Sequence, residues 1–336
     1  MRKITTYPKI LIISEFSFNN YSGGGILFRN LFEDFPKSNI AMFHEDLNFN
    51  GKELGLSICM KKKNFIISSI SKFFPSKIKY WVKSKLFKSA SVNFDIIDKI
   101  KSFKPDIIYS ILGNESIMDL IKQIHETLKI PLVIHIMDNW IDLKENQKLL
   151  ENFHYFLNNA IIRIAINRKM SDIYSKKYSK NFHIIHNAIS RGKIKKVNNS
   201  NKIFKILYIG SIYKNAQLHS LLNISNSIES LFEENINIKF HIFLPKHQLL
   251  EYKPMFKKFK SILIGENNFN DEDYFLLLSQ SNLLILASNF DKDSINYYKY
   301  SWPAKMPSYL MSEIPIFILG PSEIFFIFVA QKKIGH

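Results

Sequence analysis

The stretch SWPAKMPSYLMSEIPIFIL, residues 301–319, gives the strongest indication of the fold. Its first part predicts a helix that contains Lys305 and is punctuated by prolines. Its second part is an apolar run, which we expect to form a buried strand from Ile314. Similar β-branched runs alternate with amphipathic stretches along the whole chain. Such alternation is typical of parallel sheets that helices cover on both faces.

Two series of apolar runs indicate two such sheets. The first series predicts strands at residues 9–14, 38–44, 105–111, 131–138, 161–167 and 183–189, and the second at 204–210, 238–244, 261–264, 282–288 and 314–320. Leucine, isoleucine and phenylalanine at helical spacing predict a helix at residues 218–232. We therefore expect two doubly wound α/β domains, residues 1–190 and 203–336, joined by a polar linker at residues 191–202.

Length and composition exclude several classes of protein. The chain has 336 residues, of which 46% are hydrophobic, and this is enough to build two cores. Its single cysteine, Cys59, excludes an internal disulfide and suits a reducing compartment. The first apolar run is too short for a signal peptide, and no run approaches the length that spans a bilayer. We therefore expect a cytoplasmic protein.

The net charge of +17 comes mostly from lysine. Only five of the 46 basic residues are arginine, which specific readers of nucleic acid favour, so we expect no nucleic-acid partner. Between Lys61 and Lys88 there are nine lysines and no acidic residue, interleaved with aromatic residues such as Phe73 and Trp81. Two interpretations of this stretch stay open. It lies on an anionic membrane surface, or it is a solvated helix packed on its own domain.

Three consecutive glycines follow the first predicted strand. Gly23, Gly24 and Gly25 open a predicted helix in YSGGGILFRNLF, residues 21–32. Without side chains they let backbone amides approach a phosphate or a sugar, and the helix dipole favours negative charge there. The loop matches neither GxGxxG nor the Walker motif, and a flexible loop before a helix is the alternative interpretation.

In their order along the chain, these parts resemble the GT-B glycosyltransferases of the family 4 or group 1 type. The resemblance covers essentially the whole chain and rests on the glycine loop together with residues 104–110 (KPDIIYS), 130–140 (IPLVIHIMDNW), 165–178 (AINRKMSDIYSKKY), 184–189 (IIHNAI), 206–215 (ILYIGSIYKN) and 301–321. It implies two Rossmann-like domains that face a cleft. The second domain would hold a nucleotide-sugar donor and the first the acceptor, and transfer would retain the anomeric configuration without a metal or a cofactor.

The resemblance also implies roles for individual residues. Asp138 and Lys305 would be catalytic: the carboxylate would orient the sugar or the acceptor hydroxyl, and the ammonium would neutralise the leaving diphosphate. The donor-binding residues would be Gly23, Gly24, Gly25, Gly210, Ser211, Lys214, Asn215, Ser301, Ser308 and Tyr309. Ordinary surface positions for Lys214 and Lys305, and a helix cap for Asp138, are the alternatives. We expect Asn187 to brace the interdomain hinge and His135 to lie in the core.

The sequence departs from the family pattern at four positions. Met137 stands where the family usually has a histidine, Ser211 replaces an arginine, Ser308 replaces the glutamate that grips the ribose, and Glu313 replaces a turn glycine. Because serine lacks the charge of a carboxylate, we expect weaker donor binding. The chain also ends at His336, soon after its last predicted strand, so we expect a short second domain.

These observations favour a transferase that moves a hexose from a nucleotide-sugar to a glycan or lipid-linked acceptor, as in bacterial surface polysaccharide synthesis. Two alternatives stay open: an inactive relative that binds nucleotide-sugar or glycan, and a nucleotide-sugar epimerase. No cysteine and histidine cluster has metal-ligand spacing, and the acidic pair Asp291 and Asp293 falls where the resemblance implies sugar contacts, so we expect no metal. The absence of GxGxxG argues against a nicotinamide dehydrogenase.

Overall fold

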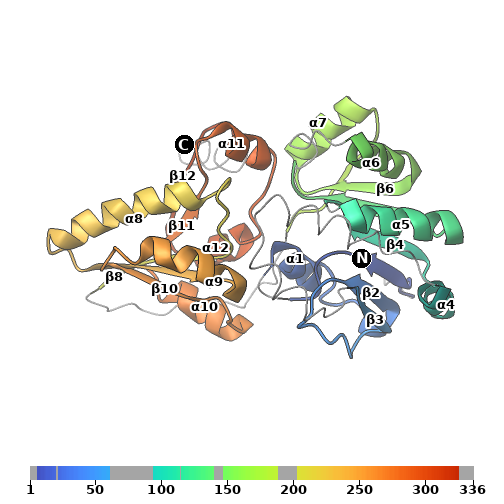
Figure 1. The fold of residues 1–336 in the computed structure, drawn as a ribbon, viewed down its shortest axis with the longest axis horizontal. Helices are drawn as coiled ribbons and strands as arrows, with labels where there is room; N and C mark the ends of the chain where they lie inside the picture. The colour runs from blue at the N-terminus through green and yellow to red at the C-terminus, as the bar shows by residue number, and fades with distance from the viewer. Residues whose placement is uncertain are drawn as a thin grey trace, which may run out of the picture.

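The computed structural model describes residues 6–19, 22–60, 94–113, 115–139, 147–187 and 203–324. They form two lobes, each with a parallel sheet at its centre (Figure 1). The predicted linker at residues 191–202 and the basic stretch at residues 61–88 lie outside the described residues. The domain boundaries near residues 190 and 203 therefore stay predictions.

Seven strands form the first sheet within the described residues. Their order is β3-β2-β1-β4-β5-β6-β7, and every neighbouring pair is parallel. The strands are β1 (Ile10–Ile13), β2 (Ile40–His44), β3 (Leu56–Cys59), β4 (Ile107–Ile111), β5 (Leu132–Ile136), β6 (Ala160–Ala165) and β7 (His183–Ile184). The helices are α1 (Gly23–Leu31), η1 (Lys37–Asn39), α4 (Phe94–Phe103), α5 (Glu115–Leu128), α6 (Gln147–Asn159) and α7 (Arg168–Tyr178). Side chains of α1 pack on one face of this sheet, and those of α4 to α7 pack on the other.

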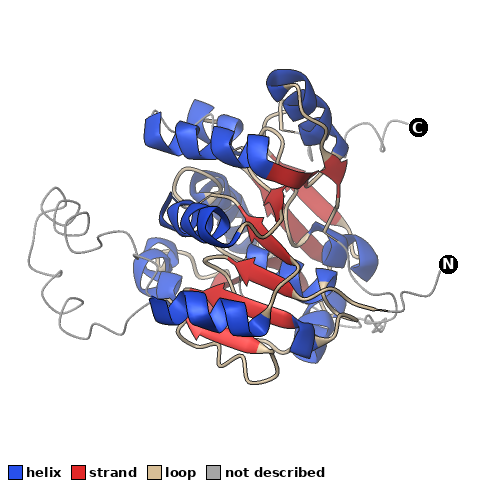
Figure 2. Cartoon of the chain, turned by 90° about the vertical axis from the view of Figure 1, so that its right-hand side faces the viewer, coloured by secondary structure: helices blue, strands red, loops and turns tan. Residues whose placement is uncertain are grey.

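Five described strands form the second sheet, in the order β10-β9-β8-β11-β12, and they too are parallel. The strands are β8 (Phe204–Ile209), β9 (Ile238–Leu244), β10 (Ile262–Glu266), β11 (Leu283–Ala287) and β12 (Ile316–Leu319). The helices are α8 (Leu218–Glu233), α9 (Lys246–Tyr252), η4 (Lys253–Phe256), α10 (Asp271–Ser279), α11 (Lys292–Tyr298) and α12 (Met306–Ser312). Figure 2 shows helices on both faces of the sheets.

Alternation along β8 explains why this sheet has a helical layer on each side. Ile206 and Tyr208 belong to the core that contains α8 and α9, whereas Leu207 and Ile209 belong to the core that contains α10 and α12. All four side chains are buried, so both faces of the strand exclude water. This is the near-continuous apolar run that the sequence showed.

The sequence predicted most strands, and the errors fall at sheet edges. It missed β3, the short edge strand Leu56–Cys59, and it made β7 longer than the two residues observed. The last strand, β12, begins at Ile316 and not at Ile314, and it lies at an edge with Phe317 exposed. The expectation of a buried last strand that begins at Ile314 was therefore wrong.

Both sheets reverse their winding beside the first strand of the domain. In the first sheet β1 separates β2 from β4, and in the second β8 separates β9 from β11. Loops at the carboxyl ends of such strands form the usual ligand crevice of doubly wound sheets. In Figure 1, α1 and α12, which lie near these strand ends, face each other where the two lobes meet.

Candidate active site

Lys305 lies beside the carboxyl end of β8. It is the N-terminal cap of α12, and its Nζ is 3.7 Å from the centre of the Tyr208 ring. Gly210 follows β8 with φ +136°, and a Cβ atom there would come within 2.8 Å of the same Nζ. The glycine therefore supplies both a backbone conformation and a space that other residues would lack. Burial lowers the pKa of the Lys305 ammonium to about 7.

Tyr208 fixes the other side of this lysine. The Lys305 ammonium makes a cation–π contact with the face of the Tyr208 ring. The buried hydroxyl of Tyr208 donates a 2.6 Å hydrogen bond to the carbonyl of Ser211. Sequence reasoning missed Tyr208 because an aromatic residue in an apolar run indicates only a core position. Its place at the end of β8, two residues before Gly210, was the available signal.

The glycines of α1 approach the same region from the first domain. Ser22 caps the helix by accepting a hydrogen bond from the Gly25 amide, 3.1 Å away. A Cβ atom at Gly23 would lie 3.4 Å from Cβ of Ala304, the residue before Lys305. The N-terminus of α1, with its partial positive charge, therefore lies next to the segment that carries the lysine.

Gly24 and Gly25 have packing reasons to be glycine. A Cβ atom at Gly24 would come within 2.2 Å of the Phe16 ring, and one at Gly25 within 2.3 Å of Asn19 Oδ1. Asn19 Oδ1 in turn accepts hydrogen bonds from the amide and the hydroxyl of Ser22, at 2.9 and 2.8 Å. Hydrogen bonds and close packing thus involve the described residues before α1, and the choice between a ligand loop and a flexible loop stays open.

Asp138 follows β5, and its partner comes from the other domain. Ser301 Oγ donates a 2.7 Å hydrogen bond to Asp138 Oδ1. Burial raises the pKa of the Asp138 carboxyl above its ordinary value, and the hydrogen bond from Ser301 partly opposes that shift. The negative charge of Asp138, with burial, raises the pKa of the nearby Tyr297 hydroxyl.

Two buried asparagines of the first domain hold the same segment of the second. Asn139 Nδ2 donates to the carbonyl of Asn296 at 3.2 Å, and Asn167 Nδ2 donates to the carbonyl of Tyr300 at 2.6 Å. Asn139 is fixed by a 2.9 Å hydrogen bond from Tyr174, and Asn167 also caps α7. The structure describes α6 from Gln147 onward, so the alternative that Asp138 and Asn139 cap a following helix stays open.

The domains also meet at an ion pair on α1 and α10. Arg29 Nη2 and Asp271 Oδ2 are 2.6 Å apart and both side chains are partly exposed. Such exposed pairs contribute about 0–1 kcal/mol, so the buried asparagine and serine contacts define the interface more strongly.

Comparison with known proteins identifies this architecture. No protein-family model matches the chain, and a search of curated proteins finds no match. Solved structures do match. Sucrose-phosphate synthase from Thermosynechococcus elongatus superposes with a TM-score of 0.58 at 10% identity, over 93% of this chain and 82% of that one. Such structures are GT-B glycosyltransferases. The chain has the GT-B fold.

Two further GT-B structures show the same likeness. Anabaena HepE in complex with UDP-glucose has a TM-score of 0.58 at 10% identity and covers 98% of this chain and 90% of its own. A UDP-forming trehalose-phosphate synthase from Burkholderia xenovorans has a TM-score of 0.57 at 10% identity and covers 94% and 84%. At such low identity the likeness establishes the fold alone.

Other predicted donor-binding residues differ in their burial and in their hydrogen-bond partners. Lys214 and Asn215 are exposed in the loop after β8, and the Lys214 carbonyl accepts a 2.9 Å hydrogen bond from the buried Asn289. Ser308 is buried, 2.7 Å from the Tyr274 hydroxyl, and donates to the Lys305 carbonyl at 2.8 Å.

Tyr309 is a structural support of the lysine segment. Its side chain is fully buried, and its hydroxyl accepts a 3.2 Å hydrogen bond from the amide of Ile209 in β8. Ser308 and Tyr309 thus join α12 to its neighbours from within the core. Their contact with a donor stays a prediction.

Of the remaining candidates, His135 and Asp291 have structural partners among the described residues. His135 is fully buried, its Nδ1 is 2.7 Å from the Tyr109 hydroxyl, and burial lowers its pKa to about 3, so it is neutral in the core. Asp291 caps α11, and among the described residues no cluster could hold a metal ion. The amide of Asn187 is buried and makes no hydrogen bond with any described residue. Its role as a hinge brace stays a prediction.

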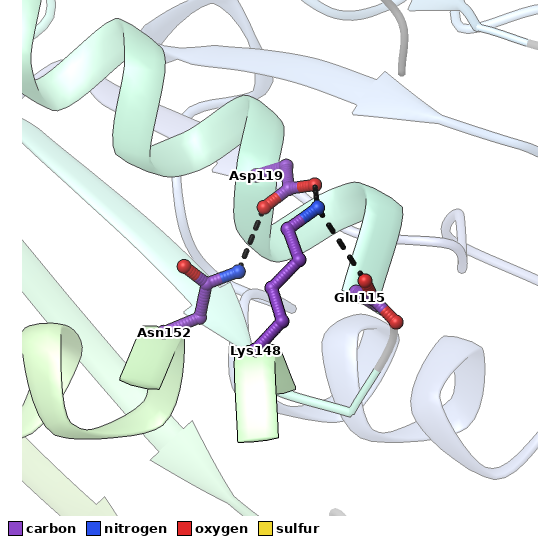
Figure 3. Close-up of polar contacts among 4 residues, drawn as sticks. All are labelled: Glu115, Asp119, Lys148 and Asn152. Carbon is purple, nitrogen blue, oxygen red and sulfur yellow. Dashed lines mark hydrogen bonds and ion pairs between the residues drawn. The ribbon is translucent and has the colours of Figure 1, made fainter. Parts of the chain in front are cut away.

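Glu115 is paired within the first domain. It begins α5, and its Oε1 is 3.4 Å from Lys148 Nζ. The same ammonium is 2.7 Å from Asp119, which also accepts from Asn152 at 2.7 Å (Figure 3). These four residues join α5 to α6, so Glu115 serves the packing of the first domain.

Proposed function

We propose that this protein is a glycosyltransferase that moves a sugar from a nucleotide-sugar donor to an acceptor hydroxyl. The observation that carries the proposal is Lys305, which a ring and a glycine hold beside the end of β8 and next to the N-terminus of α1. Positive charge from both domains suits an anionic diphosphate. The HepE structure holds UDP-glucose, which supports a nucleotide-sugar as the donor.

The proposed chemistry divides between two side chains. Lys305 would stabilise the negative charge that develops on the diphosphate as the bond to the sugar breaks. Asp138 would accept a hydrogen bond from the acceptor hydroxyl or from the sugar and so orient it for transfer. We propose transfer of a hexose with retention of configuration, to a glycan or lipid-linked acceptor of a bacterial surface polysaccharide, as the resemblance implied.

Donor binding is the first test. In a thermal-shift series with UDP-, GDP-, ADP- and CMP-linked sugars, we expect one group at millimolar concentration to raise the melting temperature. A ligand present at a hundred times its Kd stabilises the folded state by about 2.7 kcal/mol. A series without any shift would contradict the proposal.

Product analysis then separates the alternatives. A transferase releases the nucleoside diphosphate, or CMP from a CMP-linked sugar. An epimerase returns an isomeric nucleotide-sugar, and an inactive relative returns the donor unchanged. The substitutions Met137, Ser211 and Ser308 favoured the inactive relative. Ser308 lies in the core, which weakens the part of that argument that concerns the ribose.

We further propose that the protein works in the cytoplasm, at the inner face of a membrane, through residues 61–88. Cys59, the single cysteine of the chain, is exposed and suits a reducing compartment. No helix among the described residues is long and apolar enough to cross a bilayer. The basic residues 61–88 lie outside the described part of the chain, so the support for this proposal is their composition.

Vesicle binding tests the membrane proposal. Each lysine near an anionic surface contributes about 1 kcal/mol, and salt screens the attraction over about 8 Å. We expect sedimentation with anionic vesicles that weakens as salt rises and is lost when Lys77, Lys79, Lys83 and Lys85 are replaced by glutamate. Equal binding to neutral and anionic vesicles would contradict it, as would no binding to either.

A further inference from the structure

The hydroxyl of Ser301 faces two acceptors. Its Oγ is 2.7 Å from Asp138 Oδ1 in the first domain and 3.1 Å from the carbonyl of Tyr297 in its own domain. The residue is only 2% exposed, so water competes little for these contacts. A serine hydroxyl has one proton to donate and lone pairs that accept.

This geometry can hold Asp138 in either protonation state. When the carboxylate is ionised, the Ser301 proton is donated to Oδ1. When the carboxyl is protonated, its own O–H donates to Ser301 Oγ, and the serine proton turns to the carbonyl of Tyr297. Ser301 binds Oδ1, and we assign Oδ2 to a substrate hydroxyl.

The same segment carries Lys305. Ser301 lies between α11 and α12, next to the Tyr300 carbonyl that Asn167 binds and four residues before the lysine. Docking of this segment on the first domain therefore does two things at once. It brings Ser301 to Asp138, and it places the segment that carries Lys305 next to α1. Separation of the domains would remove the partner of Asp138.

We propose that Ser301 is a positioning residue that fixes the Asp138 carboxyl for sugar transfer, and that it does so only when the second domain is docked on the first. The inference rests on the proposed function. It replaces the donor contact that the sequence suggested for Ser301, because the hydroxyl is already engaged with the carboxyl.

The test compares three variants with the wild type. Ser301→Ala removes the hydroxyl, Ser301→Thr restores it, and Ser312→Ala is the matched control. Ser312 is also a buried serine of the late segment, and its Oγ donates to the carbonyl of Tyr309 at 2.7 Å without touching Asp138. Arg29→Ala, which breaks the interdomain ion pair with Asp271, controls for loosening of the domains.

Two measurements decide the outcome. One is the titration of the Asp138 carboxyl by carbon NMR, with Asp138→Asn to assign its signal. The other is turnover of UDP-glucose, or of whichever nucleotide-sugar stabilises the wild type, as a function of pH. A hydrogen bond to a charged group is worth roughly a factor of ten or more. We therefore expect Ser301→Ala to raise the Asp138 pKa by about one unit and to lower kcat about tenfold, with little change in donor KM.

The rest of the pattern follows from the same contact. Ser301→Ala should move the acid limb of the kcat profile to higher pH, Ser301→Thr should return it, and Ser312→Ala and Arg29→Ala should leave the titration unchanged. The inference is overturned if Ser301→Ala leaves the Asp138 pKa unchanged, or if it shifts that pKa and keeps the wild-type kcat. In either case, donor binding by the wild type would still support the proposed function. Failure of the wild type to bind any nucleotide-sugar overturns both.

Discussion

Lys305→Ala is expected to lower turnover about a hundredfold or more and to weaken nucleotide-sugar binding, because it removes the positive charge at the proposed diphosphate position. Lys305→Met fills more of the space over the Tyr208 ring and should show the same loss, which excludes a cavity as the cause. Lys292→Ala, at an exposed position of α11, is the matched control and should behave as wild type.

The lowered pKa of Lys305 makes this effect depend on pH. Because burial lowers that pKa to about 7, the free protein loses the charge as pH rises above neutrality. Binding of the anionic diphosphate restores the charge, so donor affinity should fall with rising pH by up to about tenfold per unit. Titration calorimetry in buffers of different ionisation enthalpy should detect proton uptake on binding. If donor affinity does not change with pH across this range, and Lys305→Ala keeps wild-type turnover, then Lys305 has a structural role only.

The same shift predicts a stability change in the free protein. The ordinary pKa of lysine is 10.5 and the folded value is about 7, so between these values the unfolded chain binds more protons. The free energy of unfolding should therefore rise with pH across this window, and Lys305→Met should remove the slope. This stability cost of a buried ammonium is consistent with a functional reason for the lysine.

The central strands could be predicted from sequence because burial on both faces leaves an unmistakable apolar run. In β8 and β9 the predicted and observed residues nearly coincide. The edge strand β3 could not be predicted, because its four residues, LSIC, include a polar side chain and form no long apolar run. The edge strand β12 is wholly apolar and was predicted, but its bounds were too wide. Lys305 was placed in the helix, whereas it caps the helix, because Pro307 lies in the first turn.

The contacts between the domains had no sequence signal. Asn167 and Asn139 bind the backbone carbonyls of Tyr300 and Asn296. Every residue has a backbone carbonyl, so the sequence does not show which one an asparagine will bind. Ser301 and Asp138 are 163 positions apart, so no local spacing relates them. The sequence could propose Asp138 and Lys305 as separate candidates at strand and helix ends. Only the packing of the two domains showed that the segment that carries Lys305 also contacts Asp138.

Asp138→Asn is expected to lower turnover about a hundredfold without lowering stability, because it removes the charge that orients the reacting hydroxyl and keeps an oxygen for the Ser301 hydrogen bond. Burial raises the Asp138 pKa above 3.8, so the folded protein binds the proton more tightly than the unfolded chain does. Wild-type stability should then fall as pH rises from 3.8 through the raised value, and the variant should lack this slope.

Melting temperatures of both proteins from acid to neutral pH, together with donor turnover, test this separation of activity from stability. The matched control is Asp119→Asn, which changes the carboxylate that joins α5 to α6 through Lys148 and Asn152 (Figure 3). That control should lose stability and keep turnover, the reverse of the pattern at Asp138. If Asp138→Asn instead keeps wild-type turnover, Asp138 serves the interface alone, and the carboxyl held by Ser301 takes no part in transfer.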